Sequence, residues 1–477
     1  MNKFKGTDTF KEMVSSFNNI IVYFDPDVDG MVAGYFVCKY ITSIGKTFKW
    51  YVNSNRSHSW GIPLEKLKGY DVITVDFMIS EKQIKDIVTS GSNIISMDHH
   101  VNQDDFIDIT INGKRGVVIN NQYPFEPENE RYLSGAGVVF ETLSALDVSF
   151  NVEENRALVG LTLLSDVCNI ENDLAKGYLE ALYNHKYKGY IRYLIDSVIG
   201  DKDWGFGVPR LDRKFVEYKF SPAINACLRF NKESDVVRFF LGMSKLDLSY
   251  RDKQKSLVKK MLLAVKVIEF EKLRVVFLCD WDDNLAYYSD VLSNFIGLIA
   301  SRYLDGKKSV ISYLISKDLK GNKYVKRASF RGCINGIDYL RATKGLIEGI
   351  GHQSAFGVLN LKPRKDLFRK VSDACGKIEE GYITTNTVTP TTNLAIFANR
   401  FGRNFANFNM FCLAQNSKYV RYVGSNIKVL VNGDSFQKYK VDGIEVKCFD
   451  SNLNFSNGLI YPILERGYIN YYLQAEV

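Results

Sequence analysis

Residues 20–30 of this chain read IIVYFDPDVDG. The five apolar residues at the start predict a buried strand, and the proline and glycine that follow indicate a turn. Asp25, Asp27 and Asp29 alternate across this turn, and carboxylates so close together repel one another unless a cation neutralises them. Oxygen ligands at the end of a strand suit Mg²⁺ or Mn²⁺. A solvated acidic turn is the alternative interpretation of this stretch taken alone.

Three further apolar stretches end in a carboxylate or a histidine. They read VITVD at 72–76, NIISMDHH at 93–100 and LTLLSD at 161–166, and they end respectively at Asp76, at Asp98, His99 and His100, and at Asp166. One strand-end aspartate by itself is more typical of a helix cap. Because open α/β folds place ligands at the carboxyl edge of a parallel sheet, the whole set predicts one shared site.

The order of these motifs resembles the DHH phosphoesterase superfamily, and within it the RecJ-like single-strand exonucleases, over about residues 20–360. Four more fragments carry the resemblance. They are SGAGVVF at 134–140, FSPAINACLR at 220–229, SNFIGLIASR at 293–302 and GIGHQSAFG at 349–357.

The alternation of strands and helices predicts an α/β fold with a parallel sheet. We expect strands near 19–24, 47–52, 71–76 and 93–97 and helices at 31–43 and 81–89. Together with the resemblance, this pattern gives four parts. They are a DHH domain at 1–195, a helical connector at 196–271, a second α/β (DHH-associated) domain at 272–380, and a small β-rich, OB-like domain at 381–477. In the second α/β domain we expect strands at 275–278 and 310–315 and a helix at about 291–304.

The clearest element of the connector is a predicted helix over 247–270, where Leu257, Met261 and Ile268 recur at helical spacing. Its cations are either a solvated helix face or the lining of a channel for a phosphate backbone. They are Arg251, Lys253, Lys255, Lys259 and Lys260.

The resemblance implies two divalent cations that share and activate a water for attack on a phosphodiester. Their expected ligands are Asp25, Asp27, Asp29, Asp76, His99, His100 and Asp166. A mixed Asp and His set suits Mn²⁺ better than Mg²⁺. We expect Asp98 to orient a histidine rather than to bind metal. The sequence leaves open which of the first three aspartates contact the metal.

The resemblance also implies a set of substrate-binding residues. They are Asn225, Arg229, Arg302, Ser329, Arg331, Gly349, Gly351 and His352. Two positions depart from the family pattern: Tyr23 stands where many relatives have a histidine, and Ile350 replaces a glycine of the Gly-Gly-His signature. The first departure weakens the expected second metal site, and the second narrows the expected phosphate loop.

The resulting function is a metal-dependent exonuclease that degrades single-stranded DNA from its 5′ end to 5′-mononucleotides. The sequence does not distinguish RNA from DNA as the nucleic-acid partner, and short oligonucleotides are also possible partners. A phosphodiesterase for short oligonucleotides or cyclic dinucleotides is the alternative, and a non-catalytic DHH scaffold is the second alternative. The connector, the element at 220–229 and the extra C-terminal region favour the exonuclease, because short substrates need no long channel.

Composition agrees with this interpretation. The length of 477 residues fits two to three domains, and a net charge of +8 permits a polyanionic partner. The eight cysteines form no CxxC pair, which argues against a disulfide framework or a zinc site and favours a reducing cytosol. We expect a bacterial or phage-encoded protein of the host cytosol, because the chain is compact, somewhat basic and poor in histidine. We expect no signal peptide and no membrane span, because the N-terminus lacks a cleavable leader and no apolar run approaches ~18 residues.

Overall fold

The structure is a computed structural model in two compact units, the larger comprising most of residues 1–375 and the smaller residues 376–477. The residues that it describes are 4–53, 60–100, 106–126, 131, 133–166, 168, 172–186, 188–199, 211, 213–334, 337–383, 390–391, 421–422, 427–432, 437–441, 444–448, 458–465 and 468–475.

The first sheet of the larger unit has the strand order β2-β1-β3-β4-β6-β5. Its pairs from β2 to β6 are parallel, and the edge strand β5 is antiparallel to β6. Every residue of β1 and β4 is buried, as expected for parallel strands covered on both faces. The predicted α/β fold is therefore confirmed. The strands are β1 (Ile20–Phe24), β2 (Phe48–Val52), β3 (Asp71–Val75), β4 (Ile94–Asp98), β5 (Asp108–Ile111) and β6 (Lys114–Asn120).

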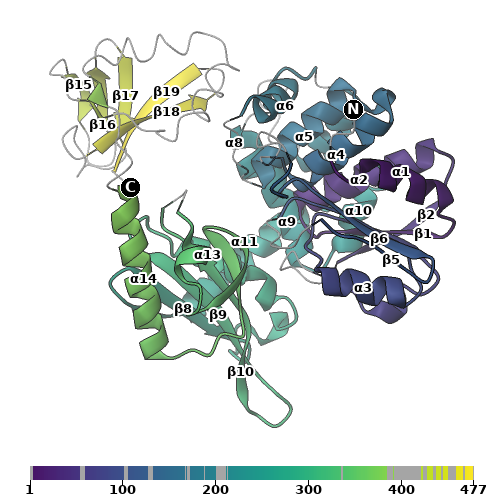
Figure 1. Ribbon diagram of the computed structural model, residues 1–477. Coiled ribbons are helices and arrows are strands. Elements are labelled where there is room, and N and C mark those ends of the chain that lie inside the picture. The colour runs from purple at the N-terminus through teal and green to yellow at the C-terminus, as the bar shows by residue number, and fades with distance from the viewer. Residues whose placement is uncertain are drawn as a thin grey trace. The chain divides into compact units, whose positions relative to one another are not determined.

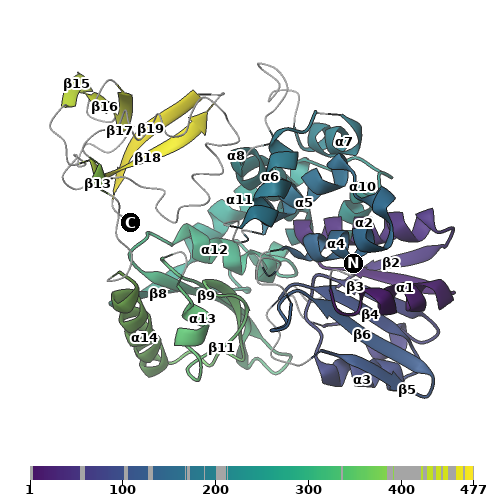
Figure 2. The same ribbon diagram turned by 45° about the horizontal axis from the view of Figure 1, so that its top comes forward.

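Helices cover both faces of this sheet (Figures 1 and 2). Helix α3 packs on one face beside β5 and β6, while α2 and α4 pack on the other beside β1 and β4. Helix α2 begins earlier than predicted, because the Asp27 carboxylate caps it by accepting a hydrogen bond from Gly30 N at 2.8 Å. The bounds are α1 (Thr7–Ser16), α2 (Val28–Ser43), α3 (Glu81–Thr89), α4 (Gly135–Leu146) and α5 (Glu153–Ser165).

The predicted helix over 247–270 is wrong in its last quarter. Helix α11 spans Ser249–Ala264, and Lys266–Glu269 instead forms strand β7, antiparallel to β8 (Leu273–Cys279). Val267 and Ile268 are β-branched and therefore favour a strand. The other helices between the two sheets are α6 (Asp173–Tyr183), α7 (Gly189–Val198), α8 (Arg213–Phe215), α9 (Ser221–Arg229) and α10 (Glu233–Phe240).

The second sheet has the order β11-β12-β10-β9-β8-β7, and only its β8–β9 pair is parallel. Helices α11 and α12 pack on it through one apolar core that includes Met261, Val276 and Phe295. Of the predicted helix near 291–304, only α12 (Ile296–Arg302) is α-helical. The remaining bounds are β9 (Ser309–Lys317), β10 (Lys323–Arg331), β11 (Glu348–His352), β12 (Ala355–Leu359), α12 (Ile296–Arg302), α13 (Tyr339–Ala342) and α14 (Lys365–Ile383).

The smaller unit is rich in strands, as predicted. Its five-stranded sheet has the order β15-β16-β17-β19-β18, with a parallel β17–β19 pair and antiparallel pairs elsewhere. Closure into an OB barrel stays a prediction. The strands are β13 (Pro390–Thr391), β14 (Arg421–Tyr422), β15 (Ile427–Asn432), β16 (Gln437–Val441), β17 (Ile444–Cys448), β18 (Gly458–Glu465) and β19 (Tyr468–Ala475).

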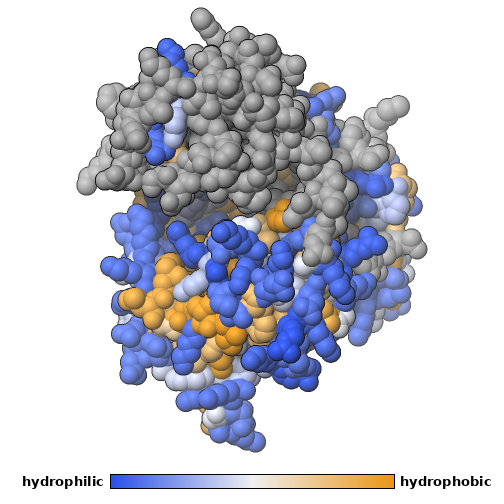
Figure 3. Space-filling view, turned by 90° about the vertical axis from the view of Figure 1, so that its left-hand side faces the viewer, coloured by the Kyte–Doolittle hydropathy of each residue, from blue (hydrophilic) through white to orange (hydrophobic). Residues whose placement is uncertain are grey.

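The described surface is a mixture of hydrophilic and apolar areas, as Figure 3 shows for one face. Large apolar side chains that are exposed include Leu263, Val267 and Ile268, at the end of α11 and in β7. Among the described residues, no helix is both long enough and apolar enough to cross a membrane.

A glycine at the contact of α5 with α6 gives a test of this packing. A Cβ at Gly160 would lie 2.3 Å from the backbone oxygen of Tyr178, so Gly160→Ala should separate the helices and destabilise the protein by about 1–3 kcal/mol. Gly177→Ala is the matched control in α6, because its Cβ would meet only Arg156 Nη2 at 3.6 Å. It should stabilise by about 0.5–1 kcal/mol. Urea unfolding measures both, and equal effects would contradict the packing.

Candidate metal centre

The carboxyl ends of β1, β3 and β4 and the end of α5 bring the sequence-predicted acidic and histidine side chains together. Asp25 follows β1, Asp76 follows β3, and His99 follows β4. Asp166 follows helix α5, whereas the other three stretches are strands of the sheet. Its side chain nevertheless reaches the same place, because its Oδ2 lies 3.6 Å from His99 Nε2.

Three groups of side chains have ligand atoms close enough to share a metal ion, since in each group these atoms lie within 4.8 Å of one another. Asp76 belongs to two of the groups, and His99 belongs to two. The groups are Asp25 with Asp27 and Asp76, Asp76 with His99 and His100, and His99 with Asp166 and Cys168. A shared Asp76 carboxylate is the arrangement expected where two cations lie side by side.

Both histidines are oriented by their Nδ1 atoms. His99 Nδ1 lies 3.2 Å from the carbonyl oxygen of Leu133, which can only accept a hydrogen bond, so Nδ1 carries the proton. His100 Nδ1 lies 2.7 Å from Asp98 Oδ1. In the neutral rings, Nε2 of each histidine therefore has a lone pair for a metal. Asp98 lies where an orienting role requires it, and that role stays a prediction.

Asp29 differs from its two neighbours, because both of its oxygens accept backbone hydrogen bonds from the start of α4. Asp29 Oδ2 accepts from Gly135 N at 2.6 Å, and Oδ1 accepts from Ala136 N at 3.0 Å. A Cβ at Gly135 would lie 2.3 Å from Asp76 Oδ1, so only glycine allows this approach. We infer that Asp29 joins α2 to α4 and shapes the centre, while Asp25 and Asp27 are the better candidates for direct ligands.

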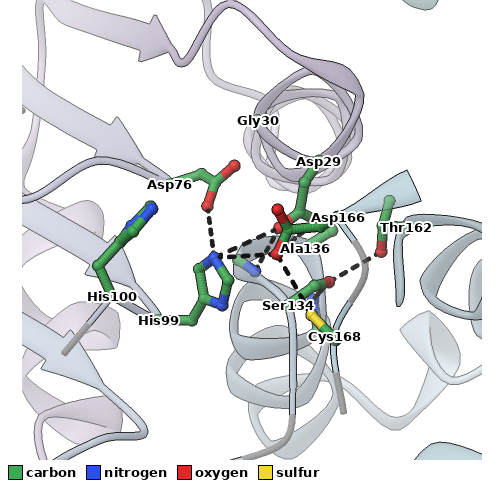
Figure 4. Close-up of polar contacts among 12 residues, drawn as sticks. Asp29, Gly30, Asp76, His99, His100, Ser134, Ala136, Thr162, Asp166 and Cys168 are labelled. Atoms are coloured by element: carbon green, nitrogen blue, oxygen red, sulfur yellow. Dashed lines mark hydrogen bonds and ion pairs between the residues drawn. The ribbon is translucent and has the colours of Figure 1, made fainter. Parts of the chain in front are cut away.

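The centre holds buried like charges that destabilise one another. Burial and then the neighbouring charges of Asp29, Asp27 and Asp25 raise the pKa of Asp76 well above its usual range. Burial raises the pKa of Asp29 to about 7, against the opposing effect of His99. At Asp98, burial raises the pKa, but the charge and hydrogen bond of His100 lower it overall. A divalent cation would remove the repulsion, and the oxygen and nitrogen donors fit Mn²⁺ or Mg²⁺. Figure 4 shows Asp76 and His99 facing each other.

Two further residues, Tyr23 and Cys168, bear on the expected set of metal ligands. Tyr23 is buried against Tyr51, with ring centroids 5.8 Å apart, and its pKa rises to about 12 through burial. Its hydroxyl is therefore neutral and a poor metal ligand at neutral pH. Cys168 was missed by the sequence analysis, because one thiol two residues after Asp166 has no spacing pattern. Only the fold brings it to His99.

Among the predicted substrate-binding residues of the second α/β part, Ser329 contacts Arg331. Arg331 Nη1 donates to Ser329 Oγ at 2.9 Å and to the Phe330 carbonyl at 2.7 Å. A Cβ at Gly297 would lie 2.7 Å from Arg331 Nη2. Burial and then the charge of Arg327 lower the pKa of Arg331 to about 10, so the guanidinium stays charged at neutral pH. In the described chain no carboxylate forms an ion pair with it, which suits an anionic ligand.

The other predicted substrate residues are placed as follows. A Cβ at Gly349 would lie 2.5 Å from both Leu340 and Phe356, so packing alone accounts for this glycine. Gly351 has a φ of 132°, which favours glycine, and Ile350 and His352 lie with it in β11. Arg229 Nη1 donates to Gln254 Oε1 at 2.9 Å, Asn225 is half-buried in α9, and Arg302 is exposed at the end of α12. Their contacts with substrate stay predictions.

Comparisons with known proteins agree with the geometry. Residues 19–165 match the DHH family, N-terminal domain. RecJ from Thermus thermophilus in complex with Mn²⁺ is similar over 99% of this chain and 71% of its own, with 18% identity and a TM-score of 0.62. The complex of the same RecJ with Mg²⁺ is similar over 99% of this chain and 70% of its own, with 16% identity and a TM-score of 0.57. An exonuclease RecJ bound to manganese is similar over 80% of this chain and 94% of its own chain, with 18% identity and a TM-score of 0.51.

No curated protein sequence matches the chain significantly. Residues 19–165 therefore resemble the DHH family, N-terminal domain, and the three structures show that the chain has a RecJ-like fold. The identities are too low for the structures to show more than the fold.

The raised carboxyl pKa values predict a pH-dependent stability. Asp29 has a folded pKa of about 7 against an ordinary value of 3.8, so the folded state binds a proton that the unfolded chain releases. The metal-free protein should therefore lose stability as pH rises between about 4 and 7. Mn²⁺ should raise Tm more at about pH 7.5 than at about pH 5, by roughly 5 °C. Thermal unfolding with and without Mn²⁺ checks this, with Asp76→Asn as the variant in which the difference should shrink. An equal Mn²⁺ effect at both pH values would contradict it.

Proposed function

We propose that this chain, which carries a DHH family domain and has the RecJ fold, is a metal-dependent exonuclease of single-stranded DNA that releases 5′-mononucleotides from the 5′ end. The observation that supports this most is the convergence of two ligand groups on Asp76. The exonuclease RecJ bound to manganese, similar in fold, supports the same reaction class. The choice of DNA and the 5′ polarity rest on the resemblance alone.

The residues that would hold the cations are Asp25, Asp27, Asp76, His99, His100 and Asp166. When bound, two divalent cations, with Mn²⁺ preferred, supply an activated water and neutralise charge on the phosphodiester. The protein supplies the orientation: Leu133 and Asp98 fix the two imidazole rings. Asp29 fixes the distance between α2 and α4.

Arg331 would bind the phosphate of the substrate. Two of its hydrogen bonds hold the guanidinium in place, and burial makes an unneutralised cation there unfavourable. A phosphate oxygen pair suits the planar guanidinium, which can donate two parallel hydrogen bonds.

The removal of one Asp76 charge tests the metal centre. Asp76→Asn should lower turnover by more than about a hundredfold, because this carboxylate belongs to two of the ligand groups. Asp86→Asn, on the exposed face of α3, is the matched control and should retain the wild-type rate. Mn²⁺-dependent release of nucleotide from labelled single-stranded DNA measures both. A wild-type rate in Asp76→Asn would refute the proposed centre.

Arg331→Gln tests the phosphate contact. The variant should raise KM for DNA by about tenfold to a hundredfold, because a charged hydrogen-bond donor is lost. The rise of Tm with Mn²⁺ should be unchanged. Arg369→Gln, exposed on α14, controls for the loss of one positive charge. If both variants have the same KM, Arg331 does not bind the substrate phosphate.

A comparison of substrates tests the exonuclease against its alternatives. The enzyme, with Mn²⁺, is given a long end-labelled single strand, the same strand as a duplex, and a trinucleotide. Release of mononucleotides from the 5′ end of the single strand is the expected result. Cleavage of the trinucleotide alone would assign the chain to the phosphodiesterases of short oligonucleotides. No cleavage with any divalent cation would favour the non-catalytic scaffold.

A further inference from the structure

Cys168 places a thiol beside two of the candidate metal ligands. Its Sγ donates to Asp166 Oδ2 at 3.3 Å, and Figure 4 shows this contact together with the contact between Asp166 and His99. His99 Nε2 lies 3.6 Å from the same Asp166 oxygen. One nitrogen, one oxygen and one sulfur therefore converge, all within 4.8 Å of one another. The exonuclease chemistry proposed above uses no thiol.

Two of the three spacings between these atoms are close to those around a tetrahedral zinc ion. Zinc bonds of about 2.0–2.3 Å place neighbouring ligand atoms about 3.4–3.7 Å apart. The Asp166–Cys168 and His99–Asp166 distances of 3.3 and 3.6 Å are close to this value. His99 already has the tautomer that such a site needs, because its Nδ1 donates to the Leu133 carbonyl.

A buried carboxylate oxygen beside these three residues also favours a bound cation. Asp76 Oδ1 is buried and, within the described residues, accepts no hydrogen bond, while it faces His99 Nε2 at 3.3 Å. Asp29 Oδ2 faces the same nitrogen at 3.9 Å. Buried carboxylate oxygens around one imidazole nitrogen are stabilised by a positive charge at that nitrogen.

We propose that His99, Asp166 and Cys168 form a site for a thiophilic divalent cation such as Zn²⁺. Thiolate sulfur selects Zn²⁺ over Mn²⁺ and Mg²⁺, and the thiol proton leaves to solvent as the ion binds. Because His99 and Asp166 also belong to the proposed Mn²⁺ centre, an ion held by Cys168 withdraws both ligands from it. Zinc then inhibits the enzyme in competition with Mn²⁺. This inhibition rests on the proposed function, but the binding does not.

Binding is measured first, without any substrate. Cd²⁺, as the spectroscopic probe, should give the ultraviolet charge-transfer band of a cadmium thiolate in the wild-type protein and in Cys279→Ser, a control that removes a different half-buried cysteine. The band should be absent in Cys168→Ser. Zn²⁺ should also protect Cys168 of the wild-type protein from alkylation, as read by peptide mass spectrometry. This last measurement needs no variant to fold.

Inhibition is measured second, at fixed Mn²⁺ with increasing Zn²⁺. Each variant is normalised to its own rate without Zn²⁺. Cys168→Ser should need about 10- to 100-fold more Zn²⁺ for half-inhibition than wild type and Cys279→Ser. Binding of Cd²⁺ without any nuclease activity would refute the proposed function and keep the site. A thiolate band that persists in Cys168→Ser, or alkylation of Cys168 that Zn²⁺ does not slow, would overturn the site.

Discussion

Mutual repulsion among buried carboxylates is the constraint on which this structure depends. Asp25, Asp29 and Asp76 are each at most 1% exposed, and burial raises the pKa of the last two. Without a cation, the folded chain holds protons that the unfolded chain would release, so the centre lowers stability near neutral pH. A divalent cation would relieve this repulsion and so stabilise the folded chain, and in this sense metal binding and folding are coupled.

The backbone around the centre is shaped to bring these charges together. A Cβ at Gly30 would lie 2.6 Å from Asp25 Cβ, and a Cβ at Gly135 would lie 2.3 Å from Asp76 Oδ1. Asp76 itself has a φ of 64°, a left-handed conformation that costs free energy in a residue with a side chain. Strain and close approach at one place indicate that the fold gives up stability to hold a site.

Arg331 shows the complementary arrangement, a half-buried cation that suits an anion. Glycine at position 297 leaves room for its guanidinium, and Ser329 holds it. In the proposed function, a centre that holds cations and a guanidinium that binds a phosphate would be the two components that phosphodiester hydrolysis requires. The zinc site proposed at Cys168 would add sensitivity to soft metals, which the hydrolysis itself does not need.

The first sheet, the convergence of the strand-end aspartates and histidines, and the likeness to the DHH family could be predicted from the sequence, because alternating apolar runs that end in Asp or His are local patterns. The same patterns indicated that Asp98 belongs beside a histidine. Other results needed the folded chain: Asp29 bonds to α4, packing accounts for Gly349, and Cys168 reaches His99. Residues 266–269 form a strand because β8 lies beside them, which helical periodicity cannot detect. Each of these results depends on contacts between residues far apart in the chain, and such contacts leave no mark on local spacing.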